Sequence, residues 1–520
     1  MATSVTAHNP AFVRITFLVL IQIALCLVAS GQVNVITYHN DSSRSGSNTS
    51  ETVLTTANVR KATFGLRFTQ PVDGFVVAQP LYLSNVNIPG LGVHNVVYVV
   101  TLNDSVYAFD ADSNTGTNAS PLWQVNFTNP SAGITTATGT NLPCEGTTGY
   151  SQAGIISTPV IDVNTQTMYV VAKTNENATV VHRLHALDVT SGAEKLGGPV
   201  VISGTFKANN GTIATFNSLH AMNRPALLEN NGSIYIAFGS NGCNDSNYGW
   251  VFAYQASNLQ QSGVFNTSPN QHYSSVWHSG SGLAADANGN IYFSTGEGKF
   301  TANTGGQDFG STFLKLNSGA TSVVDYFTPY NEVYLWQHDL DLSSSGVVVL
   351  PDQPGPNPHL LIGSGKMGTV YVLNRDNMGK FNSAGDTQIV QEMPSAVGAM
   401  FGVPVYWNNT VYFSGDARPI MAFALSNGTL VTSPIAQSVK MPGEHAPTIS
   451  SYGNTNGVLW EISGLDLFAF DSVTLTTLYN SAQSGTRDTL PSVAHFVTQT
   501  VANGKVYIGT KTCLAVYGLL

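Results

Sequence analysis

A short strand–turn–strand unit recurs eight times along this chain and constrains its fold more than any other feature. The first copy reads "NVVYVVTLNDSVYAFDA", and the copies begin near residues 95, 167, 233, 290, 359, 410, 457 and 505. A unit that buries its faces only by stacking on copies of itself, with a period of about 40 to 70 residues, is typical of a β-propeller. The sequence therefore predicts an all-β fold built from blades.

A further strand precedes each unit and begins with small residues or proline. Its copies read "AQPLYL", "ISTPVID", "NRPALL", "SGLAAD", "SSGVVV", "FGVPVY", "APTIS" and "FVTQTV". Small residues suit the crowded strand beside a central channel, so we expect these strands to be innermost. Asn/Gly turns such as "ENNGS" and "DANGN" join them to the strands that follow.

Eight inner strands predict eight four-stranded blades in one domain, residues 64–520. The chain ends on the third strand of the last blade, "LAVYGL", and the segment "GLRFTQPV" at 65–72 can supply the missing outer strand and close the ring. Residues 32–63 are then an N-terminal extension. The alternative is seven blades with an irregular extra hairpin.

The N-terminal residues 1–31 resemble a signal peptide, with Arg14 before an apolar run from Ile15 to Ala29 and cleavage before Gln32. This run is short for a bilayer span, which needs about 20 residues, and a lipid anchor on Cys26 is disfavoured by the large Leu25. We expect a monomer that is secreted or located in the periplasm or cell envelope, with no membrane span. The net charge of −10 argues against a nucleic-acid partner.

Three cysteines follow the signal peptide, so at most one disulfide forms within the chain. Cys144 and Cys243 lie in turn-rich insertions and are the candidate pair, whereas Cys513 lies in a strand and is expected to pack as a small apolar side chain.

The stretch from Val96 to Trp123 resembles the repeat of the PQQ-like, or quinoprotein alcohol dehydrogenase-like, β-propeller family. Its pattern of a strand, a small turn, "YAFD", "TG" and a Trp carries the resemblance, and "ALDVTSG" and "AFDSVTL" are weaker copies. The opening "TYHNDSSRSGSN" resembles a secreted, uncharacterised subgroup of this family. The resemblance implies the fold, but one propeller type hosts many functions.

The dehydrogenases of this family use the quinone PQQ and a calcium ion, with a vicinal cysteine pair beside the quinone. This chain has no adjacent cysteines, and we expect no cofactor. If a quinone does bind, the resemblance implies Arg224 and Lys366 as cations and Glu297 as the calcium carboxylate. Trp277 or Trp336 would then supply the aromatic ring that stacks on the quinone.

Histidines fall a few residues before the inner strand in five of the eight repeats. Loops at this position approach one mouth of the channel, so side chains distant in sequence can converge there. Such a group can bind a metal, an anion or a carboxylated sugar, or perform acid–base chemistry. The alternative is that the imidazoles only satisfy buried backbone groups. The histidines, with charged residues from the same loops, are His220, Arg224, His278, His338, Asp339, Asp341, Glu444, His445 and His495.

Three classes of function remain open. The leading one is a non-catalytic propeller that binds an extracellular small molecule or polymer at its channel mouth and long loops, since binding usually lies on loops of a rigid scaffold. The second is a quinoprotein-like oxidoreductase, and the third is a carbohydrate-active hydrolase or lyase. The long insertions are residues 130–156, 203–222, 266–280 and 299–311.

Overall fold

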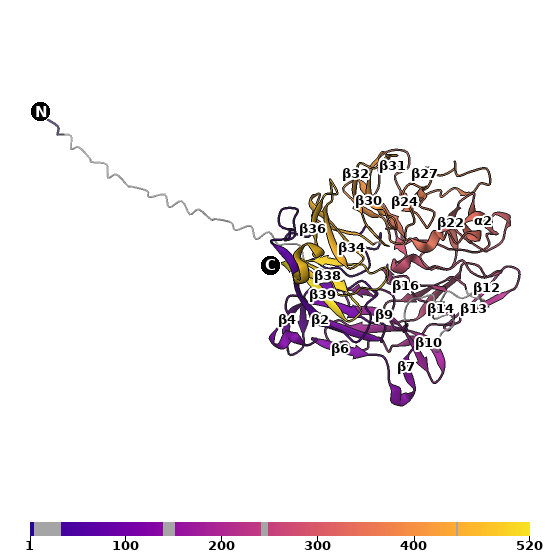
Figure 1. The fold of residues 1–520 in the computed structure, drawn as a ribbon, viewed down its shortest axis with the longest axis horizontal. Coiled ribbons are helices and arrows are strands. Elements are labelled where there is room, and N and C mark those ends of the chain that lie inside the picture. Colours follow the sequence, from indigo (N-terminus) through magenta and orange to yellow (C-terminus); the bar gives the residue numbers. More distant parts are fainter. Residues whose placement is uncertain (5–32, 139–150, 241–247, 444–445) are drawn as a thin grey trace.

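The computed structural model describes residues 1–4, 33–138, 151–240, 248–443 and 446–520. These residues form eight small antiparallel sheets arranged as the blades of a propeller (Figure 1). The prediction of eight blades is confirmed, and the seven-bladed alternative is excluded. Among the described residues, no helix is long and apolar enough to cross a membrane.

Each blade runs from an inner strand at the channel to an outer strand at the rim. Blades 1 to 4 are β3 (Leu81–Ile88), β4 (Gly92–Val100), β5 (Ser105–Asp110) and β6 (Trp123–Asn126); β8 (Val160–Asp162), β9 (Thr167–Glu176), β10 (Thr179–Asp188) and β11 (Val200–Val201); β15 (Leu228–Asn230), β16 (Ser233–Ser240), β17 (Trp250–Gln255) and β18 (Gln261–Asn266); β19 (Ala284–Ala285), β20 (Ile291–Ser294), β21 (Phe313–Leu316) and β22 (Val323–Thr328). Blades 5 to 8 are β23 (Val347–Val349), β24 (Leu360–Gly363), β25 (Val370–Asn374) and β27 (Gln391–Met393); β28 (Val405–Trp407), β29 (Thr410–Ser414), β30 (Pro419–Ser426) and β32 (Ala436–Lys440); β33 (Thr448–Tyr452), β34 (Thr455–Ser463), β35 (Asp466–Asp471) and β36 (Thr477–Asn480); β37 (Thr500–Ala502), β38 (Lys505–Gly509), β39 (Cys513–Leu519) and β2 (Phe64–Pro71).

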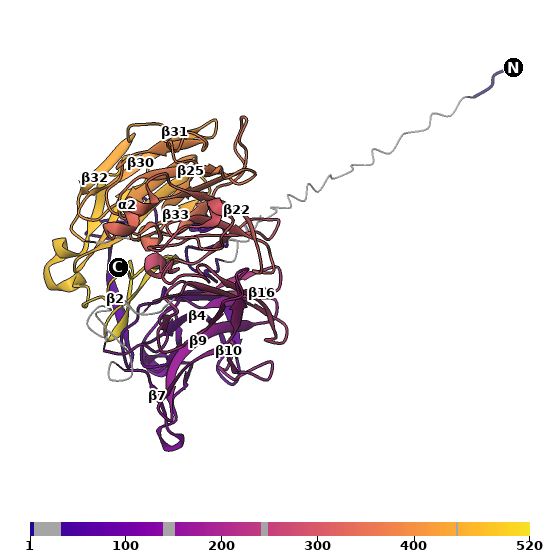
Figure 2. The same ribbon diagram turned by 90° about the vertical axis from the view of Figure 1, so that its right-hand side faces the viewer.

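The insertions add small elements at the rim and on the faces. A hairpin containing β7 (Ile134–Thr136) extends blade 2 and projects from the body in both views (Figure 1, Figure 2). The strands β12 (Thr205–Lys207) and β13 (Ile213–Thr215) pair with each other, and the helix α2 (Glu332–Gln337) lies between blades 4 and 5.

The last blade joins the two ends of the described chain. β2 pairs antiparallel with β39, so the N-terminal strand completes blade 8 as its outer strand, as the sequence predicts. Figure 1 shows the yellow C-terminal strands beside the indigo and violet N-terminal ones. In this position β2 covers the outer edge of β39, which would otherwise be an open pairing surface.

Residues 33–51, expected as part of an extension, lie inside the ring and form what we call the inner belt. The belt follows the inner strands in order around the channel. Tyr82, Ile161, Ala285, Val349, Tyr406 and Ile449 of six blades donate backbone N–H groups to belt carbonyls at residues 35, 36, 42, 43, 45 and 46. Belt side chains reach the other two blades: Arg44 Nη2 donates to Leu227 O at 3.1 Å and Asn48 Nδ2 to Val501 O at 2.8 Å.

The apolar core lies between neighbouring blades. Val96 and Trp123 of blade 1, for example, pack with Met168 and Val170 of blade 2. A tyrosine on the second strand of a blade also donates its hydroxyl to a carbonyl beyond the third strand of the next blade. The pairs are Tyr98 to Val189, Tyr169 to Ala256, Tyr235 to Ser318, Tyr412 to Ser472 and, across the closure, Tyr507 to Ala111.

These tyrosine hydroxyls should contribute measurably to stability. Tyr412→Phe removes a buried bond of 2.8 Å to Ser472 O, and leaving that carbonyl without a donor should cost about 1–2 kcal/mol of unfolding free energy. Urea denaturation checks this, with Tyr406→Phe as the control because its hydroxyl contacts only the side chain of Asn409 near the surface. Equal losses in the two variants would contradict the role of the inter-blade bond.

Arg44 should be the most costly belt side chain to remove. It is fully buried, and its guanidinium donates to Leu283 O, Thr37 Oγ1, Tyr38 O and Leu227 O at 2.8 to 3.1 Å. Arg44→Met leaves these acceptors unpaired and should lower the unfolding free energy by about 3 kcal/mol or more. The same substitution at exposed Arg60 is the control in thermal and urea unfolding. A loss at Arg44 below about 1 kcal/mol would show that the belt carries little of the stability.

Candidate ligand-binding site at the channel mouth

Two sets of loops lie at the same end of every blade. In an antiparallel sheet, the loop that enters the first strand and the loop that joins the second to the third lie on one side. We call this side the mouth face. Every sequence-predicted site residue in the described part of the chain belongs to such loops, so all of them share one face of the ring.

Four of these residues meet in what we call the mouth cluster. Glu297 follows β20, Asp339 and Asp341 lie between α2 and β23, and Lys366 lies between β24 and β25. One carboxylate oxygen from each acidic residue lies within 4.8 Å of the others. Lys366 Nζ contacts Asp339 Oδ1 at 2.6 Å and Asp341 Oδ2 at 2.8 Å.

The local backbone holds this cluster together. Lys366 donates its backbone N–H to Asp341 O at 3.0 Å. A Cβ atom on Gly296 would lie 2.7 Å from Ser343 Oγ and 2.9 Å from Asp341 Oδ1, so only glycine lets the Glu297 loop approach this closely. Asp339 has a φ of 55°, a conformation that costs free energy and is enriched at functional sites.

The carboxyl groups of the cluster differ in their ionisation. Burial, followed by the charges of Asp341 and Asp339, raises the pKa of Glu297 to about 8. Burial also acts on Asp339, but hydrogen bonds from Lys366 and Glu297 outweigh it and lower the pKa of Asp339. At neutral pH the cluster therefore combines a protonated Glu297 with an ionised Asp339 and a charged Lys366.

Exposed aromatic side chains precede the two aspartates of the mouth cluster in the same insertion. Tyr330 and Tyr334 are each 48% exposed, and Tyr334 lies on α2, a few residues before Asp339. His338 stacks on Tyr334 with ring centroids 4.0 Å apart and contacts Tyr334 O through Nδ1 at 2.9 Å. One loop thus presents aromatic faces and carboxylates together.

Arg224 belongs to a second group on the mouth face, formed with Trp277, Phe401 and Phe496. The buried guanidinium lies over the Phe496 ring, 5.6 Å from its centroid, and Nη2 donates to His495 O at 3.4 Å. Phe496 stacks on Phe401 and meets Trp277 edge-on, with centroids 5.7 and 5.3 Å apart. These rings pack against one another.

The belt supports this second group from within the channel. Tyr38 is buried, and its hydroxyl pairs with Thr498 Oγ1 at 3.3 Å, two residues beyond Phe496. Burial raises the pKa of Tyr38 to about 12, partly offset by that hydrogen bond and by the positive charges of Arg224 and Arg44. The belt tyrosine therefore lies in the field of Arg224.

The histidines do not form a joint metal site within the described residues, where the carboxylates of the mouth cluster are the only group of three or more potential ligands. His278 is fully buried, and its Nε2 lies 3.0 Å from Ser294 O and 3.2 Å from Ser294 N. Burial lowers the pKa of His278 to about 4, which keeps it neutral and structural. His220 is half-buried, and exposed His495 lies beside Phe496. His445 lies outside the described residues.

The disulfide candidates Cys144 and Cys243 also lie outside the described residues. Cys513 is buried and free in β39, with Sγ 3.2 Å from Thr510 Oγ1.

The mouth face does not fit a bound quinone with its calcium ion. Glu297 and Lys366 do meet, as that alternative requires, and the carboxylates are ligands that calcium accepts. However, Lys366 is already paired with both aspartates, and Arg224 faces Phe496 in the other group. Trp277 meets Phe496 edge-on and is already packed within the second group.

Sequence reasoning missed the aromatic residues of this face. Phe401, Phe496 and Tyr330 lie in loops and Tyr334 on the short helix α2, and no motif marks any of them. The one available signal was "TPYNEVYLWQHD", where three large rings precede the acidic pair of the mouth cluster within a single insertion.

Comparison with solved structures shows which known proteins share this fold. The quinohemoprotein alcohol dehydrogenase from Comamonas testosteroni matches 93% of this chain and 80% of its own, with a TM-score of 0.62 and 14% identity. The chain shares the propeller fold of the quinoprotein dehydrogenases. A europium-containing methanol dehydrogenase matches 94% of this chain and 98% of its own, with a TM-score of 0.57 and 12% identity. No protein-family model and no curated protein sequence matches the chain.

Glu297 should make the stability of this propeller depend on pH. Its folded-state pKa of about 8 lies above its ordinary value of 4.5. The folded state therefore holds the proton more tightly, and stability is lost as the pH rises through this window. Glu297→Gln mimics the protonated acid. The melting temperature of this variant relative to that of the wild type should therefore rise from pH 5 to pH 9. Asp416→Asn, on an exposed turn of the same face, is the control. A constant difference across this range would contradict a neutral Glu297.

Proposed function

We propose that this protein is an exported binding propeller that holds a hydroxyl-rich extracellular polymer on its mouth face, without a chemical step. The observation that carries the proposal is that one insertion carries exposed Tyr330 and Tyr334 together with two of the three carboxylates of the mouth cluster, Asp339 and Asp341. Aromatic faces pack on the apolar faces of sugar rings, and a few fixed polar groups orient a ligand.

The charges of the mouth cluster support a neutral glycan. The carboxylate oxygens of Asp339 and Asp341 accept hydrogen bonds from hydroxyl groups, while Lys366 and protonated Glu297 donate them. The three acidic residues against a single lysine disfavour an anionic ligand such as a tricarboxylate quinone. The rigid ring beneath keeps the loops in place, so binding costs little ordering.

Titration calorimetry with the soluble neutral hexasaccharides of cellulose, xylan and mannan tests the proposal on the full exported protein. At least one should bind, and Asp339→Asn or Tyr334→Ala should weaken it about tenfold or more, since each removes a direct contact. The matched controls are Asp352→Asn and Tyr452→Ala, whose exposed side chains lie on turns of the opposite face.

Failure of all three oligosaccharides to bind would contradict the proposal, as would equal losses in the control variants. Protein supplied with PQQ and calcium during export gives a second readout. A stoichiometric quinone absorption band would overturn the proposal in favour of an oxidoreductase.

A further inference from the structure

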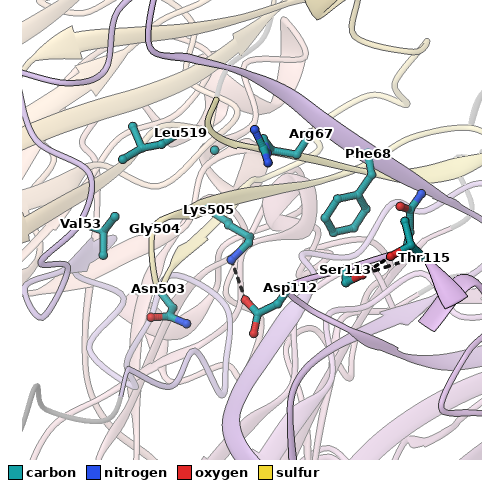
Figure 3. Close-up of a pocket in the computed structure, with 12 residues that line it drawn as sticks. Val53, Arg67, Phe68, Asp112, Ser113, Thr115, Asn503, Gly504, Lys505 and Leu519 are labelled. Carbon is teal, nitrogen blue, oxygen red and sulfur yellow. Dashed lines mark hydrogen bonds and ion pairs between the residues drawn. The ribbon is translucent and has the colours of Figure 1, made fainter. Parts of the chain in front are cut away.

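A separate cavity of about 490 Å³ lies at the closure of the ring, and we call it the seam pocket (Figure 3). Its walls come from β2 and β39 of blade 8, the turn before β38, and the turn that follows β5 of blade 1. Turns that join the first strand to the second or the third to the fourth lie on the face opposite the mouth. The pocket is therefore distinct from the site described above.

A β-bulge turns two neighbouring side chains of β2 toward this pocket. Pairing with β39 passes from Leu66 to Phe68, so Arg67 is the extra residue of the bulge. Successive residues of a regular strand point to opposite faces, but here Arg67 and Phe68 both line the pocket (Figure 3). Bulges commonly re-aim side chains in this way beside binding sites.

The two cations of the seam pocket differ in their partners. Lys505 Nζ contacts Asp112 Oδ1 at 2.6 Å, and Asn95 also donates to Asp112 at 2.8 Å. Arg67 is exposed and forms no hydrogen bond or ion pair with any residue that the structure describes. The pocket thus holds one uncompensated guanidinium beside an aromatic ring, in a protein whose net charge is −10.

A second cavity of similar volume lies between blades 4 and 5, but its guanidinium is paired with a carboxylate. Its Arg375 is buried against Asp286 at 3.4 Å, and His359 contacts Asp376 at 2.7 Å and Asp352 at 3.7 Å. Arg375 and His359 there already have carboxylate partners, and Lys315 Nζ donates to Arg375 O at 2.9 Å. An anionic ligand would have to displace these partners, whereas in the seam pocket it would meet a free guanidinium.

Uncharged polar side chains and the apolar Val53 and Leu519 complete the lining of the seam pocket. Asn114 and Asn503 contribute amides, and Ser113 and Thr115 contribute hydroxyls that contact each other at 3.1 Å. Thr115 and Asn503 are exposed, so the pocket opens to solvent. Its volume lies within the range of about 300–1,000 Å³ usual for small-molecule sites.

We propose that the seam pocket binds a carboxylated sugar unit, such as one uronate of an acidic polysaccharide. Arg67 pairs with the carboxylate, Phe68 packs on the apolar face of the sugar ring, and the amides of Asn114 and Asn503 bond its hydroxyls. This site requires only the closure of blade 8 and is independent of ligand binding on the mouth face.

Calorimetry at low salt with trigalacturonate, and with its methyl ester as the uncharged probe, tests this site. The acid should bind and the ester should bind at least about tenfold more weakly, because the ester cannot form the ion pair. Arg67→Gln should remove this preference and Phe68→Leu should weaken both probes. Arg60→Gln removes the same charge from an exposed position outside the pocket and should change nothing.

Equal affinity for acid and ester, or no binding of either, would overturn the proposal. An unchanged affinity in Arg67→Gln, with the loss appearing in Asp339→Asn instead, would place acidic sugars at the mouth cluster and also overturn it. Because Arg67 is exposed, its variant should keep the wild-type melting temperature, which separates lost binding from lost folding.

Discussion

The hydrogen bonds between the inner belt and the inner strands are the constraint on which the rest of this structure depends. The inner edge of a propeller blade carries unpaired backbone groups that face the channel. Here one segment, residues 33–51, pairs with these edges in order around the ring, and Arg44 completes its contacts at the centre. The chain then leaves the channel and forms β2, which closes blade 8. The segment from the inner belt to β2 therefore both lines the channel and closes the ring.

The belt also shapes the mouth face. Its buried Tyr38 pairs with Thr498, close to Phe496, and lies in the field of Arg224. The aromatic rings above are packed against one another, which leaves the mouth cluster and the exposed rings of the α2 loop as the accessible chemistry. Closure by β2 creates the other candidate site in the same way, because the bulge at Arg67 exists only where that strand pairs with β39.

The buried tyrosines show why so much of the fold could be predicted. Each lies in the second strand of its unit and donates to the next blade, so a local motif specifies a contact between neighbours. The inner strands, the number of blades and the closing strand follow from the same repetition. For the site, sequence position placed Asp339 and Asp341 on one face, but it gave equal weight to Arg224 and to histidines that serve other purposes, and Glu297 and Lys366 were expected only beside a quinone.

The sequence by itself determined the blade, because alternation, turn residues and packing against an identical neighbour are local properties that recur in every unit. Only the tertiary structure decided which loop residues meet. Glu297 and Lys366 come from different blades, and their contact depends on the lengths and paths of the insertions between them. His278 turns inward to Ser294 while Asp339 turns outward to Lys366, although both precede inner strands. No local sequence pattern encodes the direction of such a side chain, because the direction depends on which neighbouring loop supplies its hydrogen-bond or ion-pair partner.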